Sequence, residues 1–133
     1  MSITLTDQDE LTLRTAAYGA VSLLAAAGAA GGSPHKIATT GTLALASATG
    51  LVGRVLSEKR KPVNLDGRSV AEIADRVLPA LTAAMNLLTQ QDPAEANNFR
   101  STVLIAIEAA QQGRTSPTVA EMTRKIGAAL DAA

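Results

Sequence analysis

Apolar residues recur at intervals of three and four along most of the chain, which is the spacing of one face of an α-helix. The spacing is clearest in the second half of the sequence, where three such stripes follow one another. Their members are Val70, Ile73, Val77, Leu81, Ala84 and Leu88, then Phe99, Val103, Ile107 and Ala110, then Val119, Met122, Ile126 and Leu130. No segment shows a sustained alternation of apolar and polar residues, so the pattern predicts an all-α protein.

Proline, glycine and capping residues divide this pattern into five predicted helices. Typical N-terminal signals are Thr6 before acidic residues, Ser33-Pro34, Ser69 with Glu72, Asp92-Pro93 and Ser116-Pro117. The predicted helices cover residues 7–27, 34–59, 70–90, 93–112 and 117–131, and the one clear connector is 60–68. A chain of 133 residues is the size of one domain. We therefore expect residues 1–133 to form a single compact bundle of about five helices.

An internal similarity indicates a possible symmetry in this bundle. A shift of 83 positions aligns two helix–loop–helix units. It places Val21, Leu24, Ala26, Ala27, Ser33, Pro34 and Leu43 on Leu104, Ile107, Ala109, Ala110, Ser116, Pro117 and Ile126. We interpret this as two pseudo-symmetric units around a central helix, the one over residues 70–90.

The first two predicted helices differ from the others because they are almost free of charge. Between Thr15 and Arg54, Lys36 is the only residue with a full charge. A helix that is apolar on most of its circumference is buried among other elements. This segment is therefore either a central hairpin of the core or the seam of a homo-oligomer. The small and apolar residues that would line such an interface are Gly41, Ala44, Ala48, Leu51 and Val55.

A membrane hairpin is the alternative for the same segment. The uncharged stretches 15–34 and 37–53 approach the length of about 20 residues that spans a bilayer. Both are dominated by Ala, Gly, Thr and Ser, whereas inserted helices favour Leu, Ile and Phe. The composition disfavours membrane association.

Composition and charge exclude several classes of function. There is no Cys, which excludes disulfides, thiol chemistry and Cys-ligated metals, and a single His excludes a His–His metal pair. Twelve Lys+Arg balance twelve Asp+Glu, and only two residues are aromatic, so we expect no nucleic-acid partner. The one basic cluster is interpreted as a solvated helix end, and it comprises Arg54, Lys59, Arg60, Lys61 and Arg68.

The turn between the first two helices has the residue types of an anion pocket. Gly32, Ser33, His35 and Lys36 combine exposed N–H groups, a hydroxyl and a cation at a helix N-terminus. The spacing is not that of a phosphate-binding loop, and an ordinary capped turn explains the same residues. His35 lacks a neighbouring nucleophile and acid in sequence, so no catalytic residue is predicted.

The stretch Val103–Leu130 carries a resemblance to a known family. A helix ends there in an Ala-rich turn, and the next helix begins at Ser116 with an early Glu121. In this it resembles one half of the TerB-like helical domains of tellurite resistance, with a weaker copy around Ala20–Leu45. The resemblance implies a helical, stress-associated domain that binds an ion or a small anion.

The metal-binding acids of that family do not carry over to this sequence. Gln112 precedes Gly113 where the family has Asp, and Ala30 precedes Gly31 in the weaker copy. Glu121 is acidic but displaced from the expected spacing. The resemblance therefore implies the fold, and we expect neither a bound metal nor a cofactor.

These observations predict a cytoplasmic protein, since the acidic N-terminus is unlike a signal peptide. The 27 alanines and the excess of Arg over Lys favour a bacterial source with GC-rich DNA. We expect a protein-interaction or structural domain without catalysis of its own, whose partner is another protein or a second copy of the chain. The alternatives are a TerB-like ion- or anion-binding domain and a helical bundle that binds a small apolar ligand.

Overall fold

The computed structural model describes residues 5–28, 34–57, 69–111 and 116–133, and these residues form helices and no strand. The six helices are α1 (Asp7–Gly28), α2 (Pro34–Ala46), α3 (Gly50–Ser57), α4 (Val70–Gln91), α5 (Pro93–Gln111) and α6 (Pro117–Asp131). The prediction of an all-α fold is thus confirmed for the described part of the chain. Four predicted helices coincide with α1, α4, α5 and α6, with ends that differ by at most one residue.

Local side chains cap the start of four of these helices as the signals predict, and at α5 Asp92 Oδ1 accepts a hydrogen bond of 3.0 Å from the Ala94 N–H. Thr6 Oγ1 accepts a hydrogen bond from the Asp9 N–H at 3.0 Å, and Asp9 Oδ2 accepts one from the Thr6 N–H at 3.0 Å. Ser69 and Glu72 form the same reciprocal pair at the start of α4. Ser116 Oγ accepts from the Val119 N–H at the start of α6. Each bond satisfies an N–H group that the helix itself leaves without an acceptor.

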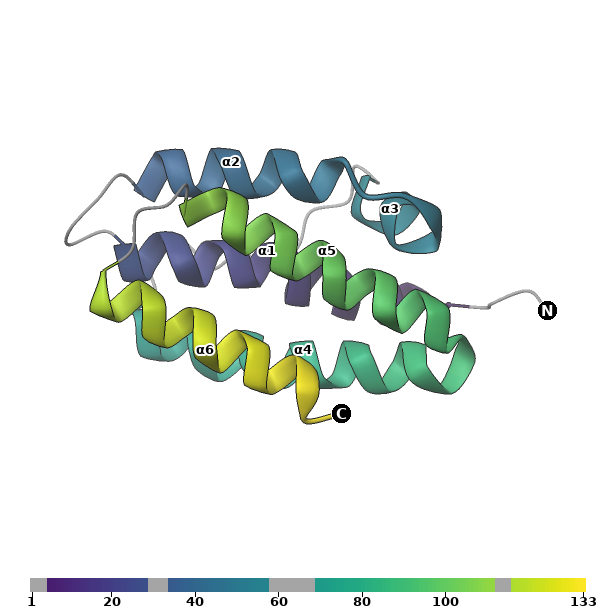
Figure 1. The fold of residues 1–133 in the computed structure, drawn as a ribbon. Coiled ribbons are helices and arrows are strands. Elements are labelled where there is room, and N and C mark those ends of the chain that lie inside the picture. The colour runs from purple at the N-terminus through teal and green to yellow at the C-terminus, as the bar shows by residue number, and fades with distance from the viewer. Residues whose placement is uncertain (1–4, 29–33, 58–68, 112–115) are drawn as a thin grey trace.

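The helix α1 lies at the centre of the bundle, with α2 and α5 on one side and α4 and α6 on the other (Figure 1). It contacts each of the other five helices and is buried over most of its length. Several of its buried residues are small, namely Ala16, Ala17, Gly19, Ala20 and Ala27. The core hypothesis for the uncharged segment therefore holds for α1. It holds for one side only of α2, whose Thr39, Thr42 and Leu43 are exposed.

The prediction of one continuous helix over residues 34–59 is wrong, because the chain breaks it at residues 47–49 into α2 and α3. At the break, the Ser47 and Ala48 N–H groups bond to carbonyls three residues earlier instead of four. Gly50 then adopts a φ of +70°, which glycine tolerates and other residues rarely adopt. A Cβ atom on Gly53 would lie only 2.2 Å from the Ala48 carbonyl oxygen. The turn is therefore tight enough that its glycines are required.

The helix α3 is tied back to α1 by the single tyrosine. The Tyr18 hydroxyl donates a hydrogen bond of 2.5 Å to the Leu56 carbonyl oxygen near the end of α3. Burial raises the pKa of Tyr18 above its ordinary value, and the nearby Arg14 guanidinium lowers that pKa by less. The phenol thus stays protonated and able to donate at neutral pH.

The predicted pseudo-symmetry around the helix over residues 70–90 stays a prediction. The corresponding helix α4 packs against α1, α5 and α6, and the helix at the centre of the bundle is α1. Part of each repeated unit, residues 29–33 and 112–115, lies outside the described residues.

The tight turn between α2 and α3 predicts contrasting effects of alanine at two glycines. Gly53→Ala forces a methyl group against backbone and is expected to destabilise the protein by about 1–3 kcal/mol. Gly127→Ala places the same methyl in open space on α6, so helix propensity should stabilise it by about 0.5–1 kcal/mol. Urea denaturation followed by circular dichroism measures both. Equal effects at the two positions would contradict the structure of the turn.

Candidate functional site

A surface hollow of about 240 Å³ lies where the turn after α2 meets α5. Ile105 of α5 lines it and is 61% exposed, and Leu43 of α2, next in sequence to the lining residue Ala44, is 64% exposed. The lining residues are Ala44, Ser47, Ala48, Thr49, Asn98, Ser101, Thr102 and Ile105. We call these eight residues together with Leu43 the α2–α5 face. None of them is charged, so the face offers apolar contact and neutral hydrogen-bonding groups.

Two polar side chains of α5 hold the turn that forms one end of this face. Asn98 Nδ2 donates a hydrogen bond of 2.9 Å to the Thr49 carbonyl oxygen. Glu95 Oε1 accepts one of 3.3 Å from the Val52 N–H in the first turn of α3. A carboxylate at this position is favoured by the positive end of the helix dipole. Glu95 thus caps a helix that is distant from it in the chain, and Asn98 holds the turn that precedes this helix.

Sequence reasoning missed the role of Glu95 and Asn98. Both belong to a polar stretch near the start of α5, and nothing in their local pattern separates them from solvent-exposed residues such as Asn97. Their partners Val52 and Thr49 are 43 and 49 residues away in the chain. Only the break between α2 and α3 places those backbone groups beside α5.

The structure divides the five residues predicted as an interface. Gly41 and Val55 are buried within the chain itself, and a Cβ atom on Gly41 would lie 2.7 Å from Val21 Cγ1. Ala44, Ala48 and Leu51 are half-buried, and both Ala44 and Ala48 line the hollow. Two of these three half-buried residues, Ala44 and Ala48, therefore belong to the α2–α5 face, and Leu51 does not.

Half of the predicted anion turn lies outside the described residues. Gly32 and Ser33 lie outside the described residues, and His35 and Lys36 belong to the first turn of α2, where Lys36 is exposed. Anion binding there stays a prediction. Of the basic cluster, Arg54 is exposed on α3 and the other four members lie outside the described residues.

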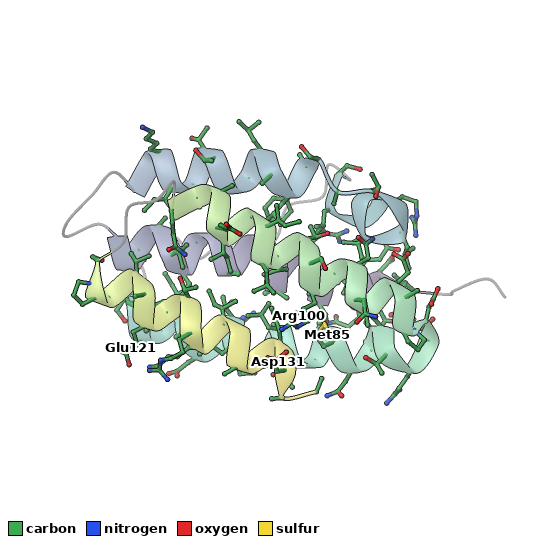
Figure 2. The ribbon with its side chains drawn as sticks, viewed as in Figure 1. Met85, Arg100, Glu121 and Asp131 are labelled. Carbon is green, nitrogen blue, oxygen red and sulfur yellow. The ribbon has the colours of Figure 1, made fainter. Side chains whose placement is uncertain are left out.

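Of the residues compared with the metal-binding acids of TerB-like domains, the structure describes Glu121. Gln112, Ala30 and Gly31 lie outside the described residues. Glu121 projects outward from α6 (Figure 2) and pairs with Arg124 at 3.5 Å and Lys125 at 3.8 Å. In the described part of the chain, no three His, Asp or Glu side chains come together as a group that could hold a metal ion.

Charged pairs are found on the other side of the bundle. Besides the two pairs of Glu121, Arg100 Nε of α5 and Asp131 Oδ1 of α6 lie 2.9 Å apart (Figure 2). Exposed pairs of this kind contribute little to stability and are typical of a surface that faces water. They contrast with the uncharged α2–α5 face.

Comparison of the chain with models of protein families, with curated proteins and with solved structures finds no match. The resemblance to TerB-like domains therefore stays a prediction. Within residues 5–28, 34–57, 69–111 and 116–133, no helix is both long and apolar enough to cross a membrane.

The contacts of α5 with the turn predict that Asn98 matters more than its neighbour. Asn98→Ala removes the donor to the Thr49 carbonyl and is expected to lower the free energy of unfolding by about 1 kcal/mol. The exposed Asn97→Ala is the matched control and should change that free energy by less than about 0.5 kcal/mol. Urea denaturation measures both. A loss at Asn97 as large as that at Asn98 would contradict the proposed role of the contact.

Proposed function

We propose that this protein is an interaction or structural domain that binds a protein partner through the α2–α5 face. The observation that carries the proposal is the exposure of Leu43 and Ile105. Among the described residues these are the two large apolar side chains that remain mostly exposed. Apart from the half-buried Leu11, the other large aliphatic residues in the described part of the chain are buried in, or packed against, the core.

The position of these two side chains supports binding more than chance exposure. A single exposed aliphatic residue is common on protein surfaces. Here Ile105 lines a hollow, and Leu43 is next in sequence to Ala44, which lines the same hollow, on a face without charge. Interfaces are typically depleted of charged residues at their centre, and apolar area removed from water contributes about 25 cal/mol per Å².

The polar groups of the face suit a protein partner. Ser47, Thr49 and Ser101 are exposed beside the hollow and can donate or accept hydrogen bonds. None of the nine residues of the face is titratable at neutral pH, so the chemistry that the face offers is contact. This favours a docking surface over an active site.

Photo-crosslinking in the cells that make the protein tests the proposal. A photo-crosslinking residue is placed at Leu43 or at Ile105, and at the exposed Ala83 of α4 as the control. We expect a discrete protein adduct from the first two positions and none from the third. Adding Leu43→Glu to the variant labelled at Ile105 should abolish its adduct. No adduct from either position, or equal adducts from all three, would overturn the proposal.

A further inference from the structure

The α2–α5 face has a defined alignment, which limits how a partner can lie on it. The two helices run in opposite directions (Figure 1). The Asn98–Thr49 contact shows which residues of α2 and α5 lie at the same position along the two helix axes. Six residues before Thr49 is Leu43, and six residues after Asn98 is Leu104, so Leu43 lies nearly level with Ile105. The two exposed aliphatic side chains therefore stand at the same height on neighbouring helices.

One end of the face carries a pair of opposite charges. Lys36 precedes Leu43 by seven residues, and Glu108 follows Ile105 by three, so each continues the same stripe of its helix. Both side chains are exposed. At a rise of about 1.5 Å per residue, the positions of Lys36 and Glu108 along the helix axes differ by roughly 6 Å. Two long side chains can span this distance. Between these residues and the far end of the face, residues 37–53 and 101–107 carry no charge.

We propose that the partner of this face is a second copy of the chain, related by a two-fold axis that runs parallel to α2 and α5. This inference rests on the proposed function. A rotation about such an axis leaves the position of each residue along the helix direction unchanged. It places α2 of one copy over α5 of the partner. Leu43 then meets the partner's Ile105, and Lys36 meets the partner's Glu108, twice by symmetry.

Charge supports a second copy as the occupant. Two copies of an uncharged face approach each other without like-charge repulsion. Among the described residues, the charges near its end, Lys36 and Glu108, are complementary across this axis. A two-fold axis perpendicular to the helices would instead bring Lys36 over the uncharged end near Ser47. The parallel axis therefore pairs both the exposed aliphatic side chains and the opposite charges of the two copies.

The size of the face predicts a weak dimer. The 13 residues of α2 extend for about 20 Å, and two neighbouring helices are together about 20 Å wide. Roughly 400 Å² of each copy is then covered, which is about half the area per partner of a standard stable interface. We expect dissociation constants on the order of 10–1000 µM, so the dimer forms only in concentrated solution.

Sedimentation velocity of the full chain over that concentration range tests the inference. We expect a reversible monomer–dimer equilibrium, with a dissociation constant raised at least about tenfold by Leu43→Glu or Ile105→Glu. Ala83→Glu, an exposed change of the same kind on α4, should leave the constant unaltered. Circular dichroism confirms that each variant folds. A monomer at the highest concentration, or a dimer that is indifferent to Leu43→Glu, would overturn the inference.

Charge reversal tests the direction of the axis. Lys36→Glu and Glu108→Lys should each weaken the dimer several-fold, and the double variant should restore it, because the pair is rebuilt across the axis with its signs exchanged. Failure of the double variant to restore the dimer would overturn this arrangement. The experiments distinguish this inference from the proposed function. If the purified protein is monomeric and the photo-adduct in cells is heavier than two chains, the docking proposal is upheld and the second copy is overturned as the partner.

Discussion

A helix that is surrounded by other helices must let their backbones come close, and α1 does so with alanine and glycine. The contact with α4 depends on Gly19, where a Cβ atom would lie 2.6 Å from Val77 Cγ2. The contact with α2 depends on Gly41, which admits Val21 of α1 in the same way. Because protein interiors are close-packed, a methyl group at either position would force the neighbour to shift. The arrangement of the whole bundle follows from these approaches.

Enclosing α1 leaves α2 with one side that nothing in the described chain covers. The side toward α1 buries Gly41 and Leu45, while Leu43 faces solvent beside α5. The α6 helix exposes ion-paired charges, which are well solvated and need no partner. In the described part of the chain, the large exposed apolar side chains are thus Leu43 and Ile105 on the α2–α5 face, and the protein-interaction proposal rests on that asymmetry.

The sequence predicts the elements well where the signals are local. The capping box of Ser69 and Glu72 and the stripe that begins at Val70 mark α4 almost to the residue, because they act within one helix. The break between α2 and α3 was missed, since Gly50 and Gly53 also fit a stripe of small residues on a continuous helix. The capping contact from Glu95 is long-range, and no local pattern encodes it.

The candidate site was predictable only in part, for the same reason. The absence of charge over residues 37–53 indicates burial or an interface for α2, but it does not indicate which side of the helix is covered. The close approach of Val21 to Gly41 places that side of α2 against α1, and Leu45 is buried as well. That fit leaves Leu43 outside, and Ile105 joins it only because α5 packs beside α2.

The central claim is that α1 is enclosed by its own chain while Leu43 and Ile105 are not covered. Relaxation of methyl NMR signals by a soluble paramagnetic probe, measured on the dilute protein, tests it directly. The account predicts strong relaxation at Leu43 and Ile105 and almost none at Leu13, Leu23 and Leu24 of α1. Protected methyl groups at Leu43 and Ile105, or strongly relaxed ones along α1, would contradict it.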